Sequence, residues 1–207
     1  MVGWSTGGAV AMQYCADYPG RCERLVLLAS ASTRGYPYYG IGASGSMERL
    51  STIQEVEKDP AKTIPVQAAY DARDGEYLKT LWNAVIYTKK QPDDQKYQEY
   101  LDDMMTQRNL ADVYQALNIF NISSVDNGLV AGSNQAKEIE IPVLVLRGNR
   151  DLVITEQMAD ELMEDLGSNA RFVSLDGCGH SPLIDDLSLL TENVESFLME
   201  GRLHEAK

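Results

Sequence analysis

The chain has 207 residues, with 31 acidic against 18 basic side chains and a formal net charge of −13. Nucleic acids and anionic membranes attract basic surfaces, so this charge argues against both kinds of partner. No apolar run approaches the roughly 20 residues that span a bilayer, so no membrane-spanning segment is expected. The three cysteines are an odd number without metal-ligand spacing, which favours reduced thiols, a cytoplasmic location and no bound metal or cofactor.

The N-terminal residues 3–8 read Gly-Trp-Ser-Thr-Gly-Gly and contain the pattern Gly-x-Ser-x-Gly. In this pattern a serine, here Ser5, occupies a sharp turn between a strand and a helix, and the two glycines leave room where side chains would collide. A short motif also arises by chance, so the residues after it matter. Residues 8–18 predict a helix that Pro19 ends, and the apolar run 25–29 predicts a strand buried on both faces.

Residues 33–135 interrupt this alternation of strands and helices, and most of the segment is expected to be helical. Helices are predicted over residues 47–58, 75–89, 93–107 and 110–120, with Pro60, Pro65 and Pro92 between them. Nine of the chain's 11 tyrosines fall in this segment. They are expected either to line a substrate pocket, to which they would bring hydroxyl groups, or to form the segment's own small core. Residues 40–45 match the dinucleotide pattern Gly-x-Gly-x-x-Gly, but the preceding residues 34–39 read as a loop, so a nucleotide site is not expected.

The C-terminal third places two polar candidates directly after predicted strands. Asp151 follows the strand 142–146 and precedes a helix over 155–166, and His180 follows the strand 171–175 and precedes a helix over about 185–199. The other histidine, His204, lies in a polar tail. A serine nucleophile needs an adjacent base, and that base needs a carboxylate to orient it. Because the carboxyl ends of parallel strands meet at one edge, Ser5, Asp151 and His180 are expected to lie together.

The order Ser, Asp, His and the three motifs around these residues resemble the α/β-hydrolase superfamily over residues 1–32 and 136–200. The resemblance implies an α/β fold with a mainly parallel sheet flanked by helices. It implies a core of residues 1–32 and 136–207, with residues 33–135 inserted as a helical cap or lid over the active site.

The same resemblance implies a serine hydrolase that acts on a carboxylic ester or a similar small acyl substrate. Ser5 would be the nucleophile, His180 the base and Asp151 the carboxylate that orients the base. The N–H group of Thr6 would form part of the oxyanion hole. Cys178 is not expected to be the nucleophile, because it lies on the loop of the base itself.

Family members have further strands before the serine turn, and a loop among them supplies a second oxyanion donor. Only Met1 and Val2 precede the motif here, so these strands are expected to be missing. We favour an incomplete copy of a full hydrolase over a natural 207-residue protein that another chain completes. The exposed sheet edge would favour a homo-oligomer or a partner chain. A non-catalytic binding or assembly module is the alternative from another class, and carbon–carbon bond hydrolases and acyltransferases remain open within the superfamily.

Overall fold

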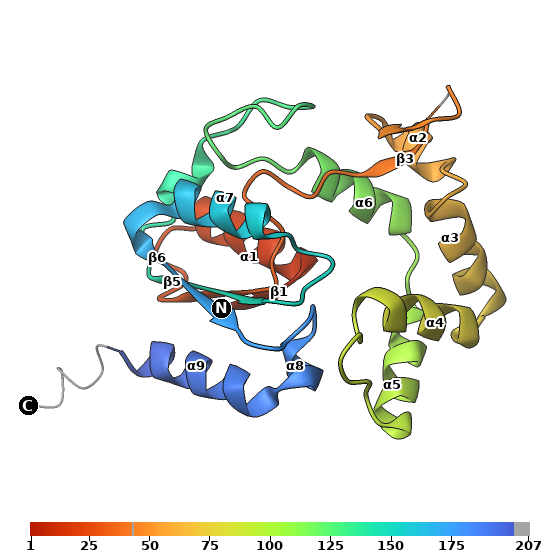
Figure 1. Ribbon diagram of the computed structural model, residues 1–207. Helices are drawn as coiled ribbons and strands as arrows, with labels where there is room; N and C mark the ends of the chain where they lie inside the picture. The colour runs from red at the N-terminus through yellow and green to blue at the C-terminus, as the bar shows by residue number, and fades with distance from the viewer. Residues whose placement is uncertain (43, 201–207) are drawn as a thin grey trace, which may run out of the picture.

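The computed structural model describes residues 1–42 and 44–200, and its centre is a four-stranded sheet (Figure 1). The strands β1 (Val2–Trp4), β2 (Leu25–Leu28), β5 (Val143–Gly148) and β6 (Ala170–Leu175) lie in the order β1-β2-β5-β6. All three strand pairings are parallel. The expectation of an α/β fold with a mainly parallel sheet flanked by helices is therefore confirmed.

The two central strands are buried on both faces, which explains their uninterrupted apolar sequences. Successive side chains of a strand point to opposite faces. On one face, Leu25 and Leu27 pack against α1 (Thr6–Asp17) and α7 (Glu156–Leu166). On the other face, Val26 and Leu28 pack against α9 (Leu187–Met199). Figure 1 shows α1 and α7 on one side of the sheet and α9 on the other.

Polar side chains mark where the helices on the two faces begin. The Thr155 hydroxyl accepts a hydrogen bond from the Met158 N–H at the start of α7. The Asp186 carboxylate accepts one from the Leu189 N–H at the start of α9. Such caps satisfy N–H groups that have no acceptor within the helix. The short helix α8 (Pro182–Asp185) precedes α9, and the 3₁₀ turns η1 (Gln135–Glu138) and η2 (Gly167–Asn169) complete this part.

The helices of residues 33–135, the segment here called the helical insertion, gather beside the sheet (Figure 1). These helices are α2 (Ile53–Glu57), α3 (Thr63–Ala72), α4 (Gly75–Val85), α5 (Asp94–Met104) and α6 (Leu110–Ile119). They enclose a small core of their own, in which Leu78, Tyr97 and Leu101 are buried. The loop after these helices instead runs over α1 and α7, and Ile122 in this loop is buried in the core of the sheet.

The helical insertion differs from the sequence expectation at two places. Pro65 lies in the first turn of α3 rather than between helices, since the N–H groups of a first turn need no helical partner. The helix expected from residue 47 begins only at Ile53, after a capping box between Thr52 and Glu55. Residues Met47–Arg49 instead form β4, which pairs antiparallel with β3 (Tyr39–Ile41).

The strands β1 and β6 lie at the two edges of the four-stranded sheet. On β1, the Val2 side chain is 59% exposed, so this edge carries an apolar group in contact with solvent. None of the helices in the described part of the chain is long and apolar enough to cross a membrane.

Candidate active site

Ser5 occupies a strained turn between β1 and α1. Its backbone has φ 52° and ψ −120°, a conformation with positive φ that residues other than glycine rarely adopt and that costs about 1–3 kcal/mol. The Ser5 N–H donates to the Leu28 carbonyl at 3.0 Å, which ties the turn to β2. A Cβ atom on Gly3 would overlap the Gly7 carbonyl, so the strand can approach the helix this closely only with glycine at position 3. The surrounding structure therefore holds the serine in the conformation typical of a nucleophile turn.

The second glycine of the motif is not required in the way that we expected. A Cβ atom on Gly7 would meet no atom within 4 Å. The crowded neighbour is Gly8, which the pattern does not include and whose Cβ would overlap the buried Ser30 side chain. The close approach of α1 to the loop after β2 therefore constrains position 8 rather than position 7.

Asp151 lies in the loop after β5, where its carboxylate is fully buried. Its Oδ1 atom accepts hydrogen bonds from the N–H groups of Val153 at 2.7 Å and Ile154 at 2.9 Å. The buried Arg147 side chain donates to the carbonyls of Ile154 at 2.6 Å and Asp151 at 3.3 Å. Sequence reasoning missed Arg147, whose only signal is a charge within an apolar strand. These bonds orient the carboxylate before any substrate binds.

His180 lies between Asp151 and Ser5 and is only 2% exposed. Its Nδ1 atom lies 3.1 Å and 3.0 Å from the two carboxylate oxygens of Asp151. Its Nε2 atom lies 3.0 Å from the Ser5 Oγ atom. Trp4 Nε1 donates to the His180 carbonyl at 2.9 Å, a contact that sequence reasoning missed although Trp4 is part of the motif. The structure thus brings three residues together from the loops after β1, β5 and β6, whereas His204 lies outside the described residues.

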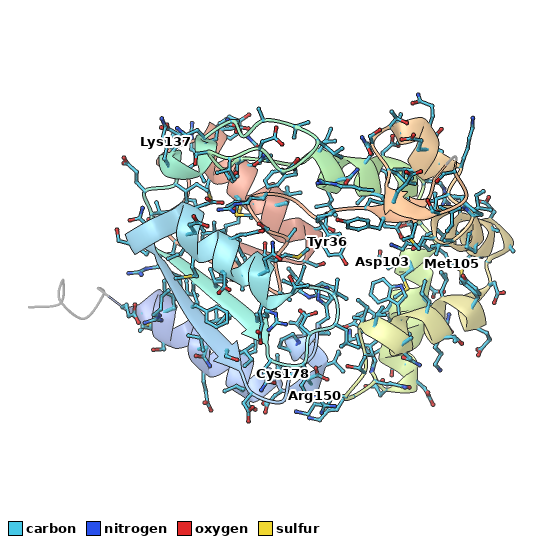
Figure 2. The ribbon with its side chains drawn as sticks, turned by 45° about the horizontal axis from the view of Figure 1, so that its top comes forward. Tyr36, Asp103, Met105, Lys137, Arg150 and Cys178 are labelled. Carbon is cyan, nitrogen blue, oxygen red and sulfur yellow. The ribbon has the colours of Figure 1, made fainter. Side chains whose placement is uncertain are left out.

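The loops that carry Asp151 and His180 are themselves joined. The Arg150 N–H donates to the Cys178 carbonyl at 2.9 Å, and both residues are labelled in Figure 2. A Cβ atom on Gly148 would overlap the carbonyls of Cys178 and Gly179. The Cys178 thiol is buried, and this burial raises its pKa, which disfavours the reactive thiolate.

A cavity of about 310 Å³ opens beside Ser5, between the sheet and the helical insertion. Tyr36, Tyr38 and Tyr114 line its wall, and Figure 2 shows Tyr36 between these two parts of the chain. The Tyr38 hydroxyl is already engaged, since it donates to Asp59 Oδ2 at 2.7 Å. Burial raises the pKa of Tyr114 to about 12, and burial also raises the pKa of Tyr36. These hydroxyls therefore stay protonated at neutral pH and are able to donate hydrogen bonds. The tyrosines therefore serve both purposes that the sequence suggested, because some line the pocket whereas Tyr97 is buried in the core of the helical insertion.

Two further groups face the same cavity. Thr6 lines it beside Ser5, and as the first residue of α1 it has an N–H without an acceptor inside the helix. Among the described residues of the wall, Lys62 carries the only charge. Its Nζ donates to the Tyr39 carbonyl at 2.7 Å and lies 5.0 Å from the centre of the Tyr38 ring. Residues 1–42 and 44–200 contain no group of three or more His, Cys, Asp or Glu side chains that could hold a metal ion.

The comparison with protein families agrees with this geometry. A family model described as alpha/beta hydrolase fold matches residues 1–187. The chain belongs to this family. A curated relative is the 2-hydroxy-6-oxononadienedioate/2-hydroxy-6-oxononatrienedioate hydrolase of Paraburkholderia phymatum, 25% identical over 181 residues. That match covers 87% of this chain and 55% of the relative, so the chain spans about half the length of the curated relative that it matches.

Solved α/β-hydrolase structures show the same fold at low sequence identity. The esterase EaEST from Exiguobacterium antarcticum superposes with a TM-score of 0.63 and 16% identity, over 96% of this chain and 66% of its own. The esterase RhEst1 from Rhodococcus sp. ECU1013 superposes with a TM-score of 0.58 and 20% identity, over 96% of this chain and 64% of its own. At such identities the likeness extends to the fold alone.

Proposed function

We propose that this chain carries the catalytic residues of a serine hydrolase that cleaves a carboxylic ester or a similar small acyl substrate. The observation that carries the proposal is the line of contacts from Asp151 through His180 to Ser5, with 3.0 Å between His180 Nε2 and Ser5 Oγ. A serine hydroxyl becomes an effective nucleophile when such a base removes its proton.

The reaction proceeds through an acyl-enzyme. His180 takes the proton of Ser5 as Oγ attacks the carbonyl carbon, and the Thr6 N–H stabilises the oxyanion. Asp151 holds the Nδ1–H tautomer and stabilises the imidazolium, which then protonates the leaving group. His180 next removes a proton from water as the water oxygen attacks the acyl carbon. The bond from this carbon to Ser5 Oγ then breaks, and His180 returns the proton to Oγ, which leaves the free acid and free Ser5. The helical insertion acts as the cap that shapes the acyl pocket, and the three free cysteines support a cytoplasmic site of action.

Labelling with a fluorophosphonate, read by intact mass and peptide mapping, tests this proposal. We expect a single adduct on Ser5 that disappears in Ser5→Ala and His180→Ala. The matched control is Ser188→Ala, because Ser188 is exposed on α9 and does not line the cavity. A folded wild-type chain that takes no label, or a label that survives in Ser5→Ala, would contradict the proposal.

A second reaction within the family is carbon–carbon bond hydrolysis. The curated relative is by its name a hydrolase of dioates, and Lys62 places a positive charge in the wall of the cavity that contains Ser5. An acyl substrate that carries a carboxylate would fit this charge. Parallel assays of neutral esters, carboxylate-bearing esters and a 2-hydroxy-6-oxo dienoate distinguish the two reactions, and acyl transfer is scored by adding an alcohol acceptor.

A candidate of another class is a binding or assembly module without catalysis. The edge position of β1 in the four-stranded sheet bears on it, because an edge strand can pair with another strand. This candidate predicts a defined homo-oligomer or a complex with a partner chain in size-exclusion chromatography. It also predicts that Ser5→Ala leaves that assembly and its biological effect unchanged, whereas the hydrolase proposal predicts loss of function.

A further inference from the structure

Asp185 is a buried carboxylate that lies outside the contacts between Ser5, His180 and Asp151. It ends the short helix α8 and is 1% exposed. A buried carboxylate is costly unless hydrogen-bond donors satisfy its oxygens. The donors that satisfy Asp185 come from two segments far apart in the sequence, and each oxygen serves one of them.

The first segment is the loop of His180. Asp185 Oδ2 accepts a hydrogen bond from the Gly179 N–H at 2.6 Å. Gly179 directly precedes His180, whose carbonyl accepts the bond from Trp4 Nε1 at 2.9 Å. The backbone of the histidine is therefore held on one side by Asp185 and on the other by Trp4.

The second segment belongs to the helical insertion. Asp185 Oδ1 accepts a hydrogen bond from the Lys90 N–H at 3.2 Å, and Lys90 Nζ donates to the Asp185 carbonyl. Thr88 also adjoins the histidine loop, since its Oγ1 lies 3.1 Å from the position that a Cβ atom on Gly179 would occupy. The insertion also approaches this region through Lys89, whose Nζ lies 3.1 Å from the position of a Cβ atom on Gly177, and through Ile184, which packs against the core of the insertion. Among these contacts, Asp185 is the group that hydrogen-bonds to both segments.

We propose that Asp185 is a positioning residue that couples the helical insertion to the base of the active site. One carboxylate group bridges Lys90 and Gly179, so the position of the insertion fixes the backbone of His180. The backbone of His180 in turn fixes the distance from its Nε2 atom to Ser5. This proposal rests on the proposed function insofar as His180 acts as the base. It assigns the insertion a second task beside shaping the pocket, namely holding the histidine loop in its reactive position.

The experiment compares Asp185→Ala and Asp185→Asn with Asp186→Ala. Asp186 is a matched control, because its carboxylate caps α9 by accepting from the Leu189 N–H at 3.0 Å, whereas the N–H groups of Gly179 and Lys90 donate to Asp185. One readout is amide hydrogen exchange at Gly179, measured relative to the slowest amides of the sheet. The other is the second-order rate of fluorophosphonate labelling at Ser5, together with kcat and KM for any ester that is cleaved.

We expect Asp185→Ala to speed exchange at Gly179 and to slow labelling at least tenfold, with a lower kcat and little change in KM. Asp186→Ala should destabilise α9 but label at the wild-type rate. Asp185→Asn keeps the shape and one acceptor oxygen, so it should fold if Asp185→Ala does not, and it should show a smaller effect in the same direction. Wild-type labelling and wild-type Gly179 exchange in a folded Asp185 variant would overturn the proposal.

The coupling itself is tested from the side of the insertion. Lys90→Pro removes both donors to Asp185, namely the N–H group that donates to Oδ1 and the ammonium group that donates to the carbonyl, whereas Lys90→Met removes the ammonium group alone. We expect faster exchange at Gly179 in Lys90→Pro, although the histidine loop is unaltered, and a smaller change in Lys90→Met. Lys96→Met is the control within the same insertion, because Lys96 pairs with Glu99 instead. Unchanged Gly179 exchange in a folded Lys90→Pro variant would overturn the coupling. If wild-type Ser5 takes no label, the proposed hydrolase function fails, while the exchange measurements still decide the coupling.

Discussion

The Nε2 atom of His180 lies 3.0 Å from the Oγ atom of Ser5, although 175 residues separate them along the chain. The opposite side of the same ring faces both carboxylate oxygens of Asp151. All three side chains extend from loops that follow parallel strands, at one edge of the sheet. Activity at this site should therefore depend most on which nitrogen of the His180 ring carries the proton.

Replacing Asp151 with asparagine should disable the base without unfolding the protein. The amide keeps an oxygen for the N–H groups of Val153 and Ile154, but its NH₂ group favours the tautomer in which Nε2 carries the proton. That tautomer is unable to accept the Ser5 proton, so the labelling rate should fall on the order of 10³- to 10⁴-fold. Asp160→Asn, an exposed site on α7, is the control. Wild-type labelling of Asp151→Asn would contradict the role of the carboxylate.

The two adjacent glycines at the start of α1 should respond oppositely to alanine. Gly7→Ala adds a methyl group into open space and should stabilise the helix by up to about 1 kcal/mol. Gly8→Ala forces the new Cβ against the buried Ser30 and should lower the free energy of unfolding by about 1–3 kcal/mol. Urea unfolding measures both, and Gly8→Ala combined with Ser30→Gly should recover part of the loss. Equal stability of the two alanine variants would contradict this crowding.

Lys62 should affect the choice of substrate rather than the chemical step. Lys62→Gln removes the charge from the cavity wall and should raise KM about two- to fivefold for carboxylate-bearing esters only, because exposed ion pairs contribute about 0.2–1 kcal/mol. Lys79→Gln is a matched control, since Lys79 Nζ also lies 5.0 Å from a tyrosine ring, that of Tyr97, but does not line this cavity. An equal change in KM for neutral esters would argue against charge recognition.

Glu55 should make the stability of the helical insertion depend on pH. The backbone N–H groups of Ser51 and Thr52 donate to its carboxylate and lower its pKa from 4.5 to about 2. Because the pKa is depressed in the folded state, the stabilisation is present above about pH 4.5 and is lost as pH falls toward 2. Thermal unfolding of wild type and Glu55→Gln should therefore differ at pH 6 and converge near pH 2. Glu57→Gln on the same helix is the control, and a wild-type advantage that persists at pH 2 would refute the assignment.

Local patterns in the chain were sufficient to predict the sheet and the edge at which its polar residues collect. Apolar runs such as 25–29 and 142–146 have the length and composition of strands that are buried on both faces. Strands of this kind pair in parallel, so their carboxyl ends lie at the same edge of the sheet. The ends of these strands then predicted Ser5, Asp151 and His180 as one group, and the resemblance of three motifs to α/β-hydrolases suggested what each residue does. Their roles in catalysis remain a proposal, as does the boundary of the cap at residues 33–135.

Contacts between distant segments have no local signal, and these appear only once the chain is folded. Trp4 donates to the carbonyl of His180 across 176 residues, and Asp185 accepts from Lys90 across 95. Pro65 lies in the first turn of α3 instead of separating two helices, at a position where its missing N–H group needs no helical partner. Hydrophobic periodicity predicts which face of a helix or strand is buried. It does not predict which other element covers that face, or which distant polar groups form hydrogen bonds, because both depend on where the folded chain places each element.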